Sequence, residues 1–296
     1  MFTDLIRPRW GSREARVCVL SCLLIIQVAG CASLVSSATG GLSDSLASAI
    51  LNQDDPETVR DGAPAFLIML DSFVQNSPED QGMLRAAAEL YAAYGVVFVE
   101  DRERSRRLTV KSRNYGRQAL CVSDEAACSA WDLPFGEFSE VVDGLGERSI
   151  ESLFTAGLSW LAYIRAHSDD WSALAELPNA EALLKKVSEL DPSYKPSELA
   201  HYLAIMATLR PPALGGRFDE GRAYFERAVE LSDGRNLGIK VDFARYYART
   251  LYERELHDSL LRNVLETDPV EDGLTLFNML ARREAQALLD SGDDYF

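Results

Sequence analysis

Two segments of the chain, "LLKKVSELDP" (183–192) and "LLRNVLETDP" (260–269), share six of their ten residues. Between them, "YFERAVELSD" (224–233) fits the same frame. Each segment has apolar residues at helical spacing and ends at Asp-Pro or Ser-Asp, and proline cannot continue a helix. The pattern therefore predicts that each segment is the second helix of a hairpin, and that such hairpins recur along the chain.

The apolar positions of the three segments lie one turn apart on one helix face. A single hairpin cannot bury such a face, whereas stacked neighbouring hairpins can. The segment "GRFDEGRAYFERAVELSD" resembles the second helix of a tetratricopeptide repeat, with small, large and small residues in the usual register. The residues expected to pack the repeats together are Leu184, Val187, Gly221, Phe225, Ala228, Leu261 and Val264.

The rest of the chain is also helical in pattern, and no stretch alternates apolar and polar residues long enough to predict a strand. We therefore expect an all-α fold made of degenerate, TPR-like hairpin repeats in an α-solenoid, because inserts at 122–146 and 168–178 break a regular period. The alternative is an ordinary helical bundle with chance similarity between segments. The other predicted helices cover residues 63–76, 80–101, 105–121 and 147–167.

The N-terminus has the pattern of a secretory signal. Four arginines precede an uncharged run from Val17 to Val28, which is shorter than the roughly 20 apolar residues of a membrane span. The run ends in Val28, Ala29 and Gly30 followed by Cys31, which resembles the lipobox of bacterial lipoproteins. That resemblance implies acylation of Cys31 and cleavage before it. The alternative is an uncleaved membrane anchor.

These features divide the sequence into four parts. Residues 1–30 are a predicted lipoprotein signal peptide, and residues 31–48, rich in Ser, Gly and Ala, a flexible tether. Residues 49–290 are the helical repeat domain and residues 291–296 a tail. Ala32 follows the cysteine; an acidic residue there would favour the inner membrane, so an anchor in the outer membrane is favoured.

The charge balance excludes one class of partner. The formal net charge is −16, and phosphate backbones are bound chiefly by Lys and Arg, so we expect no nucleic-acid partner. One stretch, residues 100–117, is basic. It is either a solvated helix face with internal Glu–Arg pairs, or a docking surface for an acidic partner or lipid headgroups.

Two cysteines, Cys121 and Cys128, remain in the predicted mature chain besides Cys31. An exported compartment is oxidising, so they form either a short disulfide loop or two buried thiols. Zinc is not expected, because no further Cys or His stands nearby.

The sequence contains no pattern typical of an enzyme. Its three histidines, His167, His201 and His257, stand apart, and there is no His-Glu-x-x-His motif or Gly-rich phosphate loop. We therefore expect no catalytic residues, no metal and no cofactor.

Several segments together resemble the TatT family, the T components of tripartite ATP-independent periplasmic (TRAP) transporter systems. They are the lipobox, "PPALGGRFDEGRAYFERAVELS", "VDFARYYARTLYERELHDSLLRNVLETDP" and "LFNMLARREAQALLD". The resemblance implies a periplasmic, lipid-anchored helical repeat protein that is not an enzyme. It also implies trimers, pairing with a periplasmic solute-binding protein, and a hole through the protomer that passes an apolar ligand.

Residues in these segments are candidates for contact with a ligand or partner, and each has a structural alternative. Gly215 and Gly216 either let a ligand approach or supply turn angles. Tyr246 and Tyr247 either line a cavity or pack between helices. Asn278 either binds a partner or satisfies backbone carbonyls. The alternative function is a generic TPR-like envelope scaffold that binds peptide segments.

Overall fold

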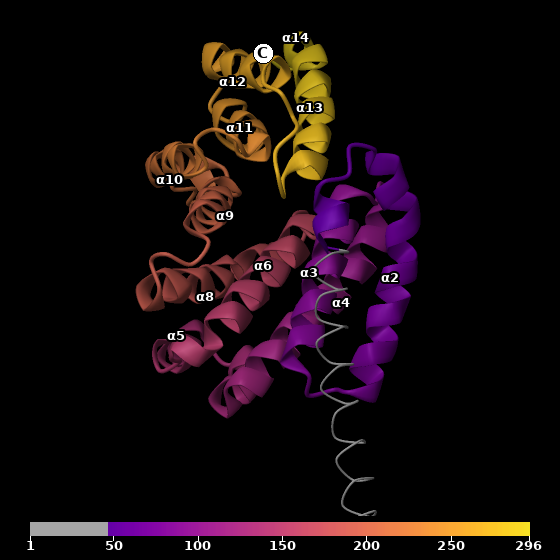
Figure 1. Cartoon of the computed structure of the whole chain (residues 1–296). Helices are drawn as coiled ribbons and strands as arrows, with labels where there is room; N and C mark the ends of the chain where they lie inside the picture. Colours follow the sequence, from indigo (N-terminus) through magenta and orange to yellow (C-terminus); the bar gives the residue numbers. More distant parts are fainter. Residues whose placement is uncertain (1–46) are drawn as a thin grey trace, which may run out of the picture. The chain divides into compact units, whose positions relative to one another are not determined.

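The computed structural model describes residues 47–296, and the chain divides into two units, residues 1–51 and 52–296. In the first unit, the described residues 47–51 are helical. The second unit, called unit 2 below, contains helices and no strand among the residues that the structure describes (Figure 1). The prediction of an all-α fold is confirmed.

The helices of unit 2 follow one another with short connections. In chain order they are α2 (Pro56–Asn76), α3 (Gln81–Val97), α4 (Arg102–Ser123), η1 (Glu125–Asp132), α5 (Phe135–Asp143), η2 (Glu147–Ser149), α6 (Ile150–Ala166), α7 (Trp171–Ala175), α8 (Leu177–Leu190), α9 (Pro196–Thr208), η3 (Pro212–Leu214), α10 (Phe218–Leu231), α11 (Leu237–Asp242), η4 (Phe243–Ala248), α12 (Arg254–Glu266), α13 (Thr275–Asp290) and α14 (Gly292–Tyr295).

Aspartate caps set the first helix boundaries. The side chains of Asp55, Asp80 and Asp101 each accept a hydrogen bond from a backbone N–H in the first turn of α2, α3 and α4, which satisfies a donor that has no partner within the helix. Helix α2 consequently begins seven residues before the predicted 63–76, and α3 ends at Val97 because Asp101 already belongs to the next helix.

The two predicted inserts are themselves helical. The first forms η1, α5 and η2, and the second contains α7. Trp131 of η1 and Phe138 of α5 pack against Trp160 of α6, with ring centroids 4.7 and 5.7 Å from the Trp160 ring. These aromatic contacts hold the first insert against α6.

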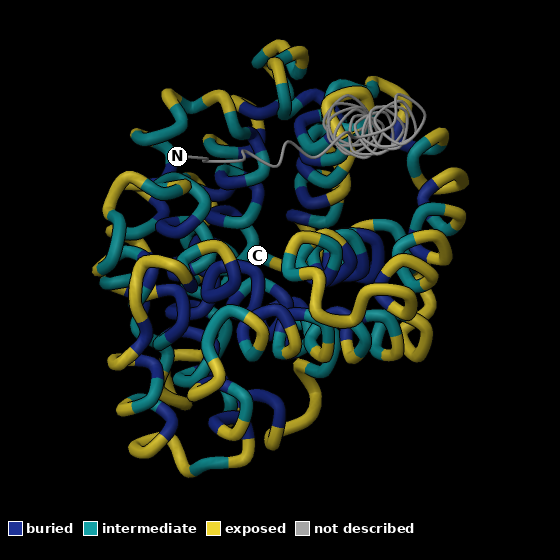
Figure 2. Tube along the Cα trace, turned by 60° about the horizontal axis from the view of Figure 1, so that its bottom comes forward, coloured by how far each residue is buried: buried dark blue, intermediate teal, exposed yellow. Residues whose placement is uncertain are grey.

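The repeated segments form α8, α10 and α12. Their apolar anchors at Leu184, Phe225 and Leu261 are fully buried, as are Val187, Ala228 and Val264. At Gly221, an added Cβ would collide with Thr208 of α9, so the glycine permits α10 to lie close against α9. Figure 2 shows buried stretches recurring along the chain with exposed turns between them.

The last long helix returns to the first. Arg283 of α13 forms an ion pair with Glu57 of α2, with Arg283 Nη2 2.8 Å from Glu57 Oε2. Asn52 donates to Asp272 at 2.9 Å and accepts from the Gly273 N–H at 2.7 Å. Because α13 and α2 are in contact, the helices of unit 2 form a closed circuit (Figure 1).

Candidate functional site

The proposed lipid attachment site lies outside the described residues. Cys31 and the preceding Val28, Ala29 and Gly30 precede residue 47, where the description begins. Within residues 47–296, no helix is both long and apolar enough to cross a membrane.

Asn278 lies at the centre of a backbone junction. It is fully buried; its Oδ1 accepts from the Leu237 N–H at 2.9 Å, and its Nδ2 donates to the carbonyls of Arg235 at 3.0 Å and Pro269 at 3.2 Å. The Asn278 amide oxygen and nitrogen are both hydrogen-bonded to backbone groups, so the side chain is not directed at a ligand. The role of Asn278 is to fix α11 against α13.

The Gly215-Gly216 turn connects η3 to α10. Gly215 has φ of +86°, a backbone conformation that glycine adopts without strain. A Cβ on Gly216 would collide with the carbonyl of Arg210. Both glycines are therefore explained by the backbone of this turn.

Tyr246 and Tyr247 lie on η4, which is a π-helix. Single π-helical turns are rare and are found disproportionately at functional sites. Tyr247 is buried against Phe218 and Phe243. Tyr246 is half-buried, and Arg165 of α6 lies 5.5 Å from its ring centroid. The π-helix thus directs Tyr247 into the core and leaves Tyr246, the residue before it, beside the charged side chain of Arg165.

Arg165 belongs to a group of side chains that we call the polar cluster: Arg165 of α6, His201 and Tyr202 of α9, Asp242 of α11 and Tyr246 of η4. All five keep some exposed surface. His201 Nε2 lies 2.9 Å from Asp242 Oδ2, and the His201 ring stacks on Tyr202 at 5.6 Å. Sequence reasoning noticed only Tyr246 and a solitary His201, because the partners are brought together from four separate elements.

The electrostatics of the polar cluster show that its charges are retained. Burial alone would raise the pKa of Asp242, but the His201 hydrogen bond and the charges of Arg165 and Arg245 lower it. Burial opposes the charge of Arg165, yet Tyr246 and Asp242 raise its pKa. Burial, together with the carboxylates of Glu198 and Glu89, raises the pKa of Tyr202. Arg165 is therefore a cation, Asp242 an anion and Tyr202 a neutral hydroxyl at neutral pH.

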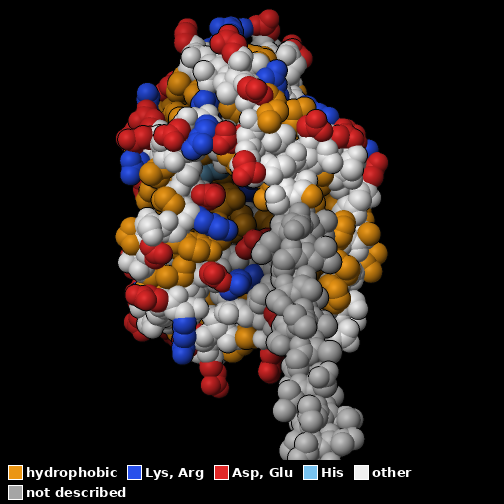
Figure 3. Space-filling model, viewed as in Figure 1, with side chains coloured by type: hydrophobic (Ala, Val, Ile, Leu, Met, Phe, Trp, Pro, Cys, Tyr) orange, Lys and Arg blue, Asp and Glu red, His pale blue; other side chains and the backbone are white. Residues whose placement is uncertain are grey.

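Figure 3 shows a hollow in one face of unit 2, at the place between α6, α9 and α11 in Figure 1. Hydrophobic side chains form its floor, and acidic, basic and histidine side chains surround it. The elements that border this hollow are those that carry the polar cluster. We call it the central hollow.

One face of α6 continues from Arg165 toward the start of the helix. Thr155 donates to Glu89 of α3 at 2.6 Å, and the Phe154 ring contacts Tyr202 at 6.0 Å. Leu158, half-buried, lies on the same face as Thr155 and Arg165.

The basic stretch 100–117 is mostly paired across helices. One internal pair is present, between Arg106 and Glu103, but Arg106 also pairs with Asp169, and Lys111 pairs with Asp71 of α2. Arg113 pairs with Glu176 at 2.8 Å. The stretch therefore differs from a simple solvated face: its cations join α4 to neighbouring elements.

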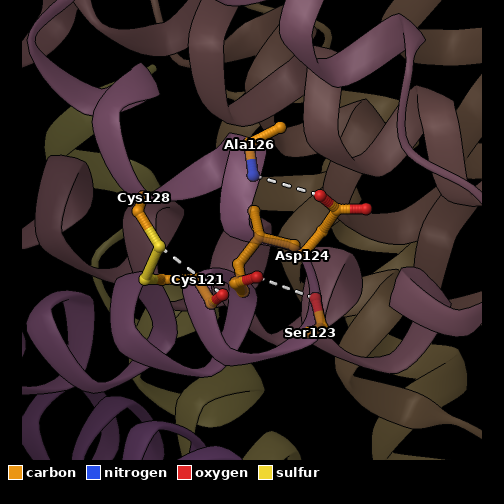
Figure 4. The surroundings of a disulfide bond; sticks show 6 residues. Cys121, Ser123, Asp124, Ala126 and Cys128 are labelled. Carbon is orange, nitrogen blue, oxygen red and sulfur yellow. Dashed lines mark hydrogen bonds between the residues drawn. A yellow bond between two sulfur atoms is a disulfide. The ribbon is translucent and has the colours of Figure 1, made fainter.

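A disulfide joins Cys121 and Cys128, whose Cα atoms are 4.4 Å apart (Figure 4). It connects the end of α4 to η1. Between the two cysteines, Asp124 accepts a hydrogen bond from the Ala126 N–H and caps η1. The bond holds the first insert to the helix that precedes it.

Nothing among residues 47–296 forms a metal-binding group of three or more His, Cys, Asp or Glu side chains. The histidines lie apart: His167 contacts the Tyr163 carbonyl, His201 contacts Asp242 and His257 contacts Asp258.

The family is shown by comparison of the sequence with known proteins. The sequence model of the TRAP transporter T-component family matches residues 52–296, and the chain belongs to this family. No curated protein matches it. Membership indicates an accessory role in transport and association with the cell envelope, in a family of transporter components rather than enzymes.

Proposed function

We propose that this protein is a non-enzymatic accessory lipoprotein of a TRAP-type transport system. It is anchored in the cell envelope facing the periplasm, docks a periplasmic solute-binding protein, and passes an apolar ligand through its helical repeat domain. The observation that carries the proposal is the central hollow, which is lined by hydrophobic side chains inside a closed circuit of helices.

The closed circuit distinguishes two functions. A generic envelope scaffold that holds peptide segments needs an open concave groove along stacked repeats. In unit 2 the contact between α13 and α2, made by Arg283 and Glu57, closes the circuit. This arrangement favours passage of a small ligand over peptide binding.

Buried repeat positions support a TPR-like origin of the fold. Helices α8, α10 and α12 act as the second helices of degenerate hairpins, and their anchors Leu184, Phe225 and Leu261 occupy equivalent core positions. We further propose that the protein assembles as a trimer, as the family resemblance implies.

The proposed anchor is a lipid on Cys31, in the outer membrane rather than the inner. Residues 1–30 are removed as a signal peptide, and residues 31–48 tether the domain to the bilayer. A single anchored chain of this kind holds a protein at the membrane surface without a spanning helix.

Palmitate labelling in cells tests the anchor. The wild type should incorporate label and Cys31→Ala should not, whereas the double variant Cys18→Ala/Cys22→Ala should retain label because those cysteines precede the cleavage site. Labelling of Cys31→Ala would contradict the proposed attachment.

Crosslinking in intact cells tests the partner. A solute-binding protein should copurify with the wild type after crosslinking, and the yield should fall for Cys31→Ala, which is not held at the membrane. Recovery of diverse envelope proteins with no solute-binding protein among them would favour the scaffold instead.

A further inference from the structure

Lys195, in the turn that precedes α9, places its ammonium over aromatic rings. Its Nζ lies 4.5 Å from the ring centroid of Phe154 of α6 and 5.7 Å from that of Tyr194. Among the described residues, no carboxylate lies within 4.0 Å of this Nζ, whereas the other lysines have polar partners, such as Asp71 for Lys111. The two rings therefore hold the Lys195 ammonium by a cation–π attraction.

The backbone of Lys195 is in an unfavourable conformation. Its φ is +42° and its ψ is +51°, in the left-handed region, which is sterically costly for a residue with a Cβ and before a proline such as Pro196. Such conformations are found disproportionately at binding sites, where the surrounding structure maintains them. The side chain is nevertheless exposed, so the ammonium is free to leave the rings without a change in the core.

Three aromatic rings, which we call the aromatic group, adjoin this ammonium. The Phe154 centroid lies 5.7 Å from that of Tyr194 and 6.0 Å from that of Tyr202 of α9. Phe154 is nearly fully buried, and the two tyrosines keep exposed surface. Groups of aromatic rings attract cations through the negative faces of the rings, and they are the usual recognition sites for quaternary ammonium ligands.

The surroundings of the aromatic group are negatively charged. Burial raises the pKa of Tyr194 to about 12, and the carboxylates of Glu151, Glu89 and Glu198 add to this effect. Glu151 pairs with Arg85, and Glu89 already accepts a hydrogen bond. Glu198, half-buried in the first turn of α9, has no ion pair and no side-chain hydrogen bond among residues 47–296. One carboxylate is thus available to a cation bound at the rings.

We propose that the aromatic group and Glu198 form a binding site for a small quaternary ammonium compound, and that the Lys195 ammonium occupies this site until the ligand displaces it. The primary ammonium of a lysine is strongly hydrated, whereas a quaternary ammonium presents methyl groups to the rings and gives up less hydration. The inference goes beyond the proposed function, because it rests on the contacts of Lys195 and does not depend on passage of an apolar ligand.

Saturation-transfer NMR of the full mature lipoprotein in dodecyl maltoside micelles tests the proposal, with protein-free micelles subtracted. The probes are choline and its uncharged carbon isostere, 3,3-dimethylbutan-1-ol. Choline should bind at least about tenfold more tightly than the isostere, because the two have the same shape and choline alone carries the charge that the rings and Glu198 attract.

Removing the resident cation should raise the affinity for choline. Lys195→Gln should bind choline about fivefold more tightly than the wild type, because the lysine side chain no longer competes for the rings. The gain should be lost in Lys195→Gln/Tyr194→Leu, which lacks one of the rings. Lys185→Gln removes a lysine that pairs with Glu181, and should bind choline as the wild type does.

Neutralising the available carboxylate should have the opposite effect. Glu198→Gln should weaken choline binding about threefold and leave binding of the isostere unchanged. Glu255→Gln removes a carboxylate from the first turn of α12 instead, and should match the wild type. Circular dichroism of each variant checks that the fold is kept.

Equal affinity for choline and the isostere, no binding of choline to Lys195→Gln, or an affinity of Lys195→Gln for choline no higher than that of the wild type would overturn the inference. These failures are separable from failure of the proposed function, because palmitate labelling and crosslinking test the anchor and the partner without reference to Lys195.

Discussion

Arg113 and Arg165 show how two arginines that lie beside aromatic rings differ in their charged partners. Arg113 of α4 stacks on the rings of Trp160 and Tyr163, at 4.6 and 4.5 Å, and pairs with Glu176. Arg165 of α6 also lies beside a tyrosine, but no described carboxylate contacts it. Arg113 joins α4 to its neighbours through an ion pair, whereas Arg165 interacts with Tyr246 and has no carboxylate in contact among the described residues. The difference lies in the carboxylate partner, since both arginines lie against aromatic rings.

The same contrast holds for apolar residues. Phe225 in the seam between repeats is fully buried and stacks on Phe243 at 4.9 Å. Leu158 of α6 keeps part of its surface exposed. Phe225 is fully enclosed and Leu158 is not, so the two positions should respond differently to the same kind of substitution.

The largest expected effect is the loss of Phe225. Phe225→Ala should lower the free energy of unfolding by about 3–5 kcal/mol, because it leaves a cavity that the surrounding helices cannot fill. Leu158→Ala should cost about 1 kcal/mol or less, since part of the side chain is already exposed. Urea unfolding followed by circular dichroism measures both. Similar losses for the two variants would remove the distinction between the two positions.

Neutralising the two arginines should give the next largest difference. Arg113→Gln should lower the free energy of unfolding by about 2 kcal/mol, because it leaves the half-buried Glu176 without its ion pair. Arg165→Gln should be neutral or slightly stabilising, because it removes a buried charge that has no ion-pair partner. Thermal melts of the two variants compare them directly. A larger loss for Arg165→Gln would mean that Arg165 is structural after all.

The disulfide should contribute about 2 kcal/mol, as expected for closure of a short loop. Cys121→Ser/Cys128→Ser should therefore unfold at lower urea concentration than the wild type, and reductant should shift the wild type but not the variant. The insert carrying Trp131 should loosen first, which tryptophan fluorescence would report. Coincident reductant effects on both proteins would show that the shift has another origin.

The smallest effect concerns acid. The pKa of Asp242 is lowered in the folded state, so its contribution to stability is present above the ordinary carboxyl pKa and is lost as pH falls through the folded value. Asp242→Asn should consequently lose less stability than the wild type between about pH 5 and pH 3. Urea midpoints at both pH values measure this. An equal loss of stability in the two proteins would exclude a role for Asp242 in the acid sensitivity of the wild type.

The sequence predicted the helical class well because the apolar spacing of each segment is local information. Boundaries were less accurate where a cap or a neighbouring helix decided them: α2 begins at Pro56 because Asp55 caps it, seven residues before the predicted range 63–76. The first insert breaks the regular period of the repeats, yet it is helical and is held against α6 because Trp131 and Phe138 pack on Trp160.

The site was harder to foresee. The motif containing Tyr246 and Tyr247 attracted attention, but the π-helix that separates their environments depends on the surrounding core. Asp242 and Arg165 had no signal in the sequence, because each is an ordinary charged residue on an amphipathic helix. The polar cluster becomes visible only in the folded chain, where His201 contacts Asp242, a residue 41 positions further along the sequence.

The amino-acid sequence by itself determined that the chain is helical, which positions face a core, and to which family the chain is similar. These properties follow from the spacing of apolar residues and from short motifs. The tertiary structure alone decided that α13 returns to α2, that a hollow lies among the helices, and that Arg165 has no carboxylate of the described residues in contact. The physical reason is that burial and pairing of a charge depend on which distant side chains the folded chain brings within a few ångströms.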